Sequence, residues 1–165
     1  MRYFKENEMK CHCCRQLPEE YKMNAYALVD NLLDPVRAKF GNPIKVNSFY
    51  RCRKHNSEVG GSPRSQHLVT EAADVAAEAK GYANMTAWKE ANRQIAGLII
   101  REGKFDQLIL ENVGEKDLLP TWVHVSFSRK LNRGQILKKV AGKAGYAVVT
   151  AEEICKLLGS GFKKA

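Results

Sequence analysis

Two imidazoles and one carboxylate are the side chains of this protein whose types and spacing could hold a catalytic metal ion. The sequence has four histidines, and one of them, His67, is followed seven positions later by Asp74. Another, His124, lies in the segment WVHVSF, which has the composition of a strand. Three ligands of this kind leave the fourth position of a tetrahedral zinc ion open. From residue types alone, an ordinary hydrogen-bonded histidine remains the alternative at each position.

A second group of metal-ligand side chains is the run CHCC at residues 11–14. The chain has five cysteines, which are Cys11, Cys13, Cys14, Cys52 and Cys155. An odd number argues against a framework of disulfides. Zinc sites usually separate paired ligands by two or more residues and need a second pair, and the sequence does not place Cys52 or Cys155 beside the run. We therefore predict free thiols, with a structural metal that includes His12 as the alternative.

Hydrophobic periodicity indicates the helices that must support these residues. Apolar residues at helical spacing predict a helix from about Glu19 to Phe40, which Pro35 is expected to kink or split. A second helix is predicted over Thr86 to Glu102, with Thr86 as its N-cap. The sequence Thr150 to Glu153 has a capping-box pattern, which predicts a short helix near the end of the chain.

The predicted strands surround the candidate ligands. Residues 44–50, 105–111 and 122–127 are rich in β-forming residues, and the last two are expected to form a loose hairpin. Residues 51–66 are polar and contain two adjacent glycines, which indicates an irregular loop, and residues 67–76 are expected to be extended. Helices mixed with antiparallel strands predict an α+β fold, a single domain in which helices pack on one antiparallel sheet.

Three runs in the sequence, SFYRCRKHN, GGSPRSQHLVTEAAD and WVHVSF, together resemble the M15 zinc peptidases, the D-alanyl-D-alanine carboxypeptidase group. That group has the pattern S-x-H-x-x-G-x-A-x-D, followed later by a strand with W-x-H or H-x-H. The matching residues are Ser65, His67, Ala72, Asp74, His124 and, at the end of the preceding strand, Arg51. The resemblance covers residues 44 to 127, and the combination is specific although each piece alone is weak.

The resemblance implies a hedgehog/DD-peptidase-like domain over residues 1–165, with its motif core at about 44–127. It implies a Zn²⁺ cofactor on His67, Asp74 and His124, and hydrolysis of peptidoglycan stem-peptide amide bonds by a carboxypeptidase or an endopeptidase. Arg51 would bind the substrate carboxylate or stabilise the oxyanion, with a loop-anchoring salt bridge as its alternative role. Ser65 and Gln66 are expected to contact substrate beside the metal.

The sequence departs from the family pattern at three positions. Thr70 stands where the family has glycine, Thr121 where it often has an acidic general base, and Trp122 where many members have histidine. A carboxylate must therefore come from elsewhere to move the proton. We predict Glu111, because it ends the strand that should pair with the His124 strand. Asp117 and Glu115 in the connecting loop are the alternatives. The departures also keep open a second function, a catalytically inactive, zinc-containing module that binds the cell wall.

The net charge predicts the class of partner. At +9, the chain favours polyanions such as acidic cell-wall polymers, and a merely soluble basic surface is the alternative. A modest basic cluster toward the C-terminus consists of Lys138, Lys139, Lys143, Lys163 and Lys164. Aromatic and basic residues do not interleave as in RNA-binding motifs, so we expect no specific nucleic acid, and a nucleic-acid-binding function would rest on charge alone.

The same composition bears on where the protein acts. No apolar run approaches the roughly 18 residues that span a membrane, and the segment MRYFKENEMK lacks the apolar core of a secretory signal. We therefore expect no membrane span and a protein that is cytoplasmic as synthesised. Separately, we expect a monomer. It would act on peptidoglycan peptides of the cell wall after release by another route, as a phage lysin does.

Overall fold

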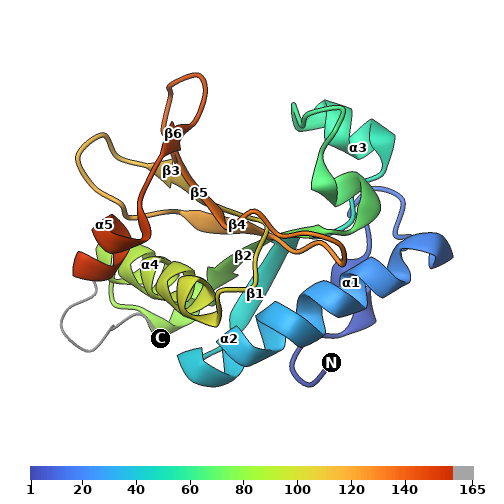
Figure 1. Ribbon diagram of the computed structural model, residues 1–165, viewed down its shortest axis with the longest axis horizontal. Helices are drawn as coiled ribbons and strands as arrows, with labels where there is room; N and C mark the ends of the chain where they lie inside the picture. Colours follow the sequence, from blue (N-terminus) through green and yellow to red (C-terminus); the bar gives the residue numbers. More distant parts are fainter. Residues whose placement is uncertain (158–165) are drawn as a thin grey trace.

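One six-stranded sheet organises the chain in the computed structural model, which describes residues 1–157 (Figure 1). Lys163 and Lys164 of the predicted basic cluster lie outside the described residues. The strands are β1 (Ile44–Ser48), β2 (Ala72–Ala77), β3 (Gln107–Val113), β4 (Trp122–Ser126), β5 (Gln135–Val140) and β6 (Ala147–Val148). Their order is β1-β2-β4-β3-β5-β6, and every neighbouring pair is antiparallel except β3 with β5. The predicted α+β fold, with helices packed on a mostly antiparallel sheet, is confirmed.

The predicted first helix forms, but it changes pitch along its length. A 3-10 turn (Glu19–Tyr21) leads into α1 (Lys22–Leu28), a π-helical segment (Val29–Leu33) follows, and α2 (Asp34–Phe40) completes it. Helical structure continues through Pro35, so this residue does not split the helix in two. It lies in the first turn of α2, and there the π-helical segment has already changed the hydrogen-bonding pattern.

The two other predicted helices, α4 and α5, both form, and α4 begins earlier than predicted. The long helix α4 spans Met85–Glu102, and its N-cap is Asn84, whose side chain accepts a hydrogen bond from the Ala87 amide. The prediction of Thr86 as N-cap is therefore wrong by two residues, because asparagine is an equally good cap that begins the helix earlier. The capping box of Thr150 and Glu153 is confirmed at the start of α5 (Ala151–Lys156).

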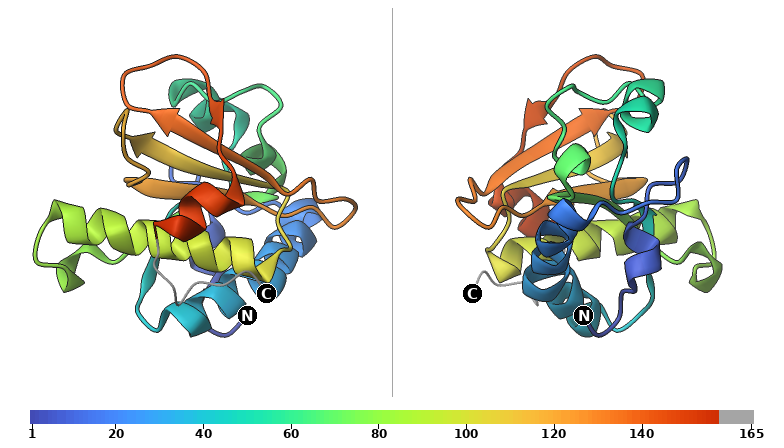
Figure 2. Two further views of the ribbon diagram at one scale, coloured as in Figure 1. Left: turned by 60° about the vertical axis from the view of Figure 1, so that its left-hand side comes forward. Right: turned by 90° about the vertical axis from the view of Figure 1, so that its right-hand side faces the viewer.

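The sheet has one face covered by helices and one that carries polar side chains. Val75, Leu108, Leu110, Val123 and Val125 are fully buried on the face that packs against α4. The two views of Figure 2 place α1, α2, α4 and α5 on this side of the sheet and the short helix α3 on the other. Because side chains alternate along a strand, the residues between these apolar ones project from the opposite face.

Two local predictions around the motif are wrong. The polar stretch 51–66 is not an irregular loop throughout, because it contains α3 (Arg53–Glu58), whose first turn is capped when the His55 amide donates to the Cys52 sulfur. Residues 67–76 are not extended throughout, because a 3-10 turn (Gln66–Val69) precedes β2. Thr70 ends this turn in the left-handed region, at φ 58°, where glycine is the residue that fits without strain.

The Thr70 side chain has a hydrogen bond that glycine could not make. Its hydroxyl donates to the Tyr21 carbonyl at 2.6 Å, which ties the turn to the first helical segment. This bond offsets part of the cost of the left-handed backbone.

Two strands were not predicted. β5 pairs in parallel with β3, and β6 pairs with β5, so both depend on partners that are distant in sequence. The antiparallel pairing of β3 with β4 that the hairpin predicted is confirmed. Among the described residues, no helix is both long enough and apolar enough to cross a membrane.

Candidate metal centre

The register of the sheet places one histidine beside one carboxylate. Asp74 of β2 lies opposite His124 of β4. Cross-strand partners project from the same face, so both side chains point away from the helical layer. His67 comes from the 3-10 turn that precedes β2 and is 2% exposed. The three predicted ligands therefore meet although they come from three separate elements.

The ligand atoms of these residues lie at distances that suit one metal ion. His67 Nε2 lies 3.2 Å from His124 Nδ1 and 3.3 Å from Asp74 Oδ1, and His124 Nδ1 lies 2.9 Å from Asp74 Oδ1. A tetrahedral zinc ion with bonds of about 2.0–2.1 Å would hold its ligand atoms roughly 3.3–3.4 Å apart. Within residues 1–157, these three form one of two groups of His, Cys, Asp and Glu side chains that could hold a metal ion.

The protonation of His67 and Asp74 also suits a cation. His67 Nδ1 lies 2.6 Å from the Phe49 carbonyl, an acceptor, so Nδ1 carries the proton and the lone pair of Nε2 faces His124 and Asp74. Burial lowers the pKa of His67 and keeps it neutral. Burial by itself would raise the pKa of Asp74, but the hydrogen bond from His124 and the close contact with the His67 imidazole outweigh it and hold that pKa well below its usual range.

Arg51 is bound to the ligand set rather than projecting free into solvent. Its guanidinium forms an ion pair with Asp74, and its Nε donates to the Ser48 hydroxyl at 2.7 Å. Its backbone amide donates to the His67 carbonyl at 3.1 Å. Arg51 therefore connects the end of β1 to two of the candidate ligands.

An open cavity of about 700 Å³ lies over the three candidate ligands. Arg51, Glu111 and Trp122 contribute to its lining. Glu111 of β3 lies opposite Trp122 of β4, which places it diagonally from His124 on the same face. Burial raises the pKa of Glu111, with a smaller opposing effect from His124. A half-buried carboxylate with a raised pKa in a cleft is suited to proton transfer.

The two alternative carboxylates lie elsewhere. Asp117 is exposed and accepts hydrogen bonds from the Gly114 and Leu119 amides, both at 3.1 Å. Glu115 is exposed and forms an ion pair with Lys143. Neither residue is among those that line the cavity. Of the three carboxylates named from the sequence, Glu111 is the one that faces the candidate ligands.

Ser65 and Gln66 line the cavity, but their side chains bond to the protein. The Ser65 hydroxyl accepts a hydrogen bond from the His67 amide at 3.3 Å and so caps the 3-10 turn. Gln66 Nε2 donates to Asp106 at 2.9 Å, and Asp106 also receives two side-chain hydrogen bonds from Arg133, at 2.6 and 2.8 Å. These contacts fix the turn that carries His67.

Several residues of the site were not identified from the sequence. Gln107 and Ile109 share the Glu111 face of β3, and strand alternation could have indicated them. Tyr146 also lines the cavity, from the connection between β5 and β6, and no local pattern marks it. The Phe49 carbonyl could not be found at all, because a backbone acceptor is independent of residue type.

An α+β domain that holds two imidazoles and a carboxylate under an open cavity has the arrangement of a metal-dependent hydrolase. The sequence model of the Peptidase M15 family matches residues 2–106, and the chain belongs to this family. This confirms the resemblance, and family membership implies a zinc-dependent metallopeptidase. The matched segment contains His67 and Asp74 and ends before Glu111 and His124. A comparison with curated proteins found no match.

Proposed function

We propose that the protein hydrolyses amide bonds in the stem peptides of peptidoglycan, with Zn²⁺ on His67, Asp74 and His124. The observation that carries the proposal is the meeting of these three side chains, with all ligand atoms within 4.8 Å, under a cavity that Glu111 also lines. A bound zinc ion would polarise the substrate carbonyl. It would also lower the pKa of its bound water, so that hydroxide would be available to attack the carbonyl near neutral pH.

Three residues of the chain have proposed roles in proton transfer and in holding the ligands. Glu111 takes the proton from the attacking water and returns it to the leaving amine. Burial raises the pKa of Glu111, so its protonated form is more stable than that of an exposed glutamate. This favours the step in which Glu111 holds the proton before it passes to the leaving amine. Arg51 holds Asp74 in position through their ion pair. The neutral state of His67 follows from its burial and its bond to Phe49.

The charge of the cavity supports an acidic peptide as substrate. Arg64 is an exposed residue of its lining, beside Arg51 and Arg133, whose guanidinium groups already pair with Asp74 and Asp106. Stem peptides carry free carboxylates beside the bonds between D-residues, and guanidinium groups bind carboxylates through a planar fork of donors. Ser65 and Gln66 hold the adjoining turn in place and lie within reach of a bound peptide. The net charge of +9 would also favour approach to an anionic wall, so we place the activity at the cell wall.

Purified muropeptides, both uncross-linked and cross-linked, test this function. The zinc-loaded protein should release D-alanine or divide cross-linked dimers, as detected by liquid chromatography and mass spectrometry, and a chelator should stop the reaction. Glu111→Gln should cleave about 10²–10⁴-fold more slowly. Glu115→Gln is the matched control, because it changes an exposed carboxylate in the β3–β4 connection, and it should keep full activity.

Two results would overturn the proposal in different ways. Zinc-loaded protein that binds muropeptides without cleaving them would make the inactive cell-wall-binding module the correct function. Cleavage of ordinary L-peptides with no action on muropeptides would keep the peptidase and reject the substrate. We expect a monomer as the active form.

A further inference from the structure

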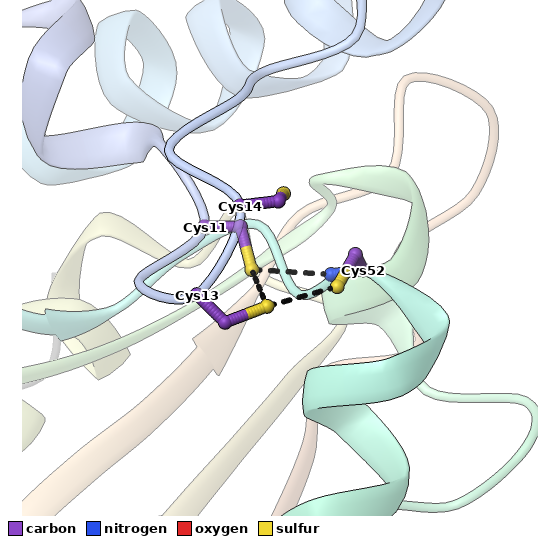
Figure 3. A group of neighbouring side chains, drawn as sticks. All are labelled: Cys11, Cys13, Cys14 and Cys52. Carbon is purple, nitrogen blue, oxygen red and sulfur yellow. Dashed lines mark hydrogen bonds between the residues drawn. The ribbon is translucent and has the colours of Figure 1, made fainter.

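The structure brings Cys52 beside the three cysteines of the CHCC run, so that four of the five cysteines form one cluster (Figure 3). Three of them, Cys11, Cys13 and Cys14, lie in the loop that follows the 3-10 turn Glu6–Met9, and Cys52 is the N-cap of α3. The Sγ atoms of Cys11 and Cys13 are 3.7 Å apart, and those of Cys13 and Cys52 are 3.2 Å apart. All four sulfurs lie within 4.8 Å of one another.

We propose that Cys11, Cys13, Cys14 and Cys52 bind one Zn²⁺ ion in a tetrahedral thiolate site, separate from the His67–Asp74–His124 centre. With zinc–sulfur bonds of about 2.3 Å, the sulfurs of such a site are roughly 3.8 Å apart. The Cys11–Cys13 separation of 3.7 Å is close to this value, the Cys13–Cys52 separation of 3.2 Å is shorter, and all four sulfurs lie within 4.8 Å of one another. In Figure 3 the Cys14 side chain points away from the other three sulfurs, so the proposed site requires it to turn toward them. Each thiol releases its proton when it binds the ion.

Backbone amides around the cluster are aimed at its sulfurs, as suits thiolates. The Cys52 amide donates to Cys11 Sγ at 3.4 Å, and the His55 amide donates to Cys52 Sγ at 3.5 Å. Donors of this kind stabilise negative charge on sulfur and orient metal ligands.

The loop that carries three of the ligands has its own backbone restraints. The Cys11 amide donates to the Gln16 carbonyl at 3.0 Å, and the Arg15 amide donates to the Cys11 carbonyl at 2.9 Å. The Tyr50 amide donates to the Met9 carbonyl at 3.1 Å, which fixes the base of the loop beside the end of β1. Backbone hydrogen bonds therefore hold Cys52 close to the loop cysteines, so their proximity does not depend on side-chain rotamers alone.

The position of this cluster gives it a role. Cys52 directly follows Arg51, which forms the ion pair with Asp74. A metal ion on the cluster would therefore brace the N-terminal loop against the segment that orients a ligand of the other centre. The sequence predicted free thiols because it could not place Cys52, and the tertiary position of Cys52 supplies the missing ligand. The inference does not depend on the peptidase function.

Metal content and cobalt spectroscopy of the full chain test the site without any activity measurement. We expect two equivalents of zinc in the purified wild-type protein by elemental analysis. Cobalt substitution should give an intense sulfur-to-cobalt charge-transfer band in the near ultraviolet, which ligands from histidine and aspartate cannot produce. Wild-type protein that takes up cobalt without this band would overturn the proposal, whatever the behaviour of the variants.

Variants assign the ligands. Cys52→Ser should lose one equivalent of metal and the charge-transfer band, whereas His67→Ala should lose the other equivalent and keep the band. Cys14→Ser should lower the intensity of the band, and unchanged intensity would reject the four-cysteine assignment. Cys155→Ser is the matched control, because Cys155 lies on α5 away from the cluster, and it should keep both equivalents. An intact mass that shows a Cys13–Cys52 disulfide in freshly purified protein, or two equivalents of metal retained in Cys52→Ser, would also overturn the proposal.

Discussion

The two groups of metal-ligand side chains differ in what holds them together. Asp74 and His124 are fixed by strand register, and His67 is fixed by a buried hydrogen bond to the Phe49 carbonyl. The cysteine cluster has no strand among its elements, since it joins a loop to the first turn of a short helix. Its restraints are a few backbone hydrogen bonds and contacts between sulfurs.

This difference predicts different roles for the two proposed ions. The sheet would keep the geometry of the His/Asp/His centre without metal, so an ion there serves chemistry more than folding. The cysteine cluster would depend on its ion to offset the entropy of an ordered loop, as structural zinc sites do. Substitutions that change one metal-ligand group and leave the other intact test whether the first ion is catalytic and the second structural.

The largest effect is expected for His67→Ala. The variant should lose one equivalent of metal and all measurable turnover, because two remaining ligands do not hold zinc in a catalytic geometry. Elemental analysis and muropeptide cleavage measure the two losses, and circular dichroism should show an unchanged fold. Full metal content in this variant would place the ion elsewhere and remove the distinction between the two regions.

Glu111→Gln should lower kcat by about 10²–10⁴-fold, the usual contribution of a general base. Metal content should not change, because Glu111 is outside both ligand groups. Burial raises the pKa of Glu111, and the base must be ionised to act. The acid limb of the kcat/KM profile should therefore lie above the ordinary glutamate pKa of about 4.3 and should disappear in the variant. A profile with the same limb in both proteins would assign it to another group.

Arg51→Lys should weaken metal binding at the His/Asp/His centre by about 10–100-fold, the usual effect of changing a group that orients a ligand. Lysine keeps the charge but cannot bond to both Asp74 and Ser48 in one plane. Competition with a chromophoric chelator measures the affinity. Arg64→Lys is the control, because Arg64 is an exposed residue of the same cavity. Equal affinities for the two variants would leave Arg51 without a positioning role.

Asp106→Asn should have the smallest effect, a loss of about 1 kcal/mol in the free energy of unfolding near neutral pH, since solvent screens the half-exposed Arg133. Hydrogen bonds from Arg133 lower the pKa of Asp106 in the folded protein. The stabilisation is therefore present above the unfolded pKa of about 3.9 and is lost as the pH falls through the lower folded value. Urea unfolding at several pH values should show the two proteins converge in acid. A constant difference would mean that the ion pair does not support the cavity wall.

Local pattern predicted much of the framework. The alternation in β1, β3 and β4 and the capping box of α5 depend on neighbours in sequence, and these elements form where predicted to within a few residues. The helix α3 was missed because its N-cap is the sulfur of Cys52, an uncommon acceptor. The strand β5 was missed because its parallel pairing with β3 has no hairpin to mark it.

For the site, the sequence by itself determined which side chains could bind a metal and how His67 and Asp74 are spaced. That information is local, because residue type and spacing fix the available chemistry. Only the tertiary structure decided which groups meet: that Glu111 lines the cavity while Asp117 and Glu115 do not, that Arg51 pairs with Asp74, and that Cys52 joins the loop cysteines. Each of these depends on strand register or on the path of a loop. Both are set by packing between segments distant in the chain, which no local pattern encodes.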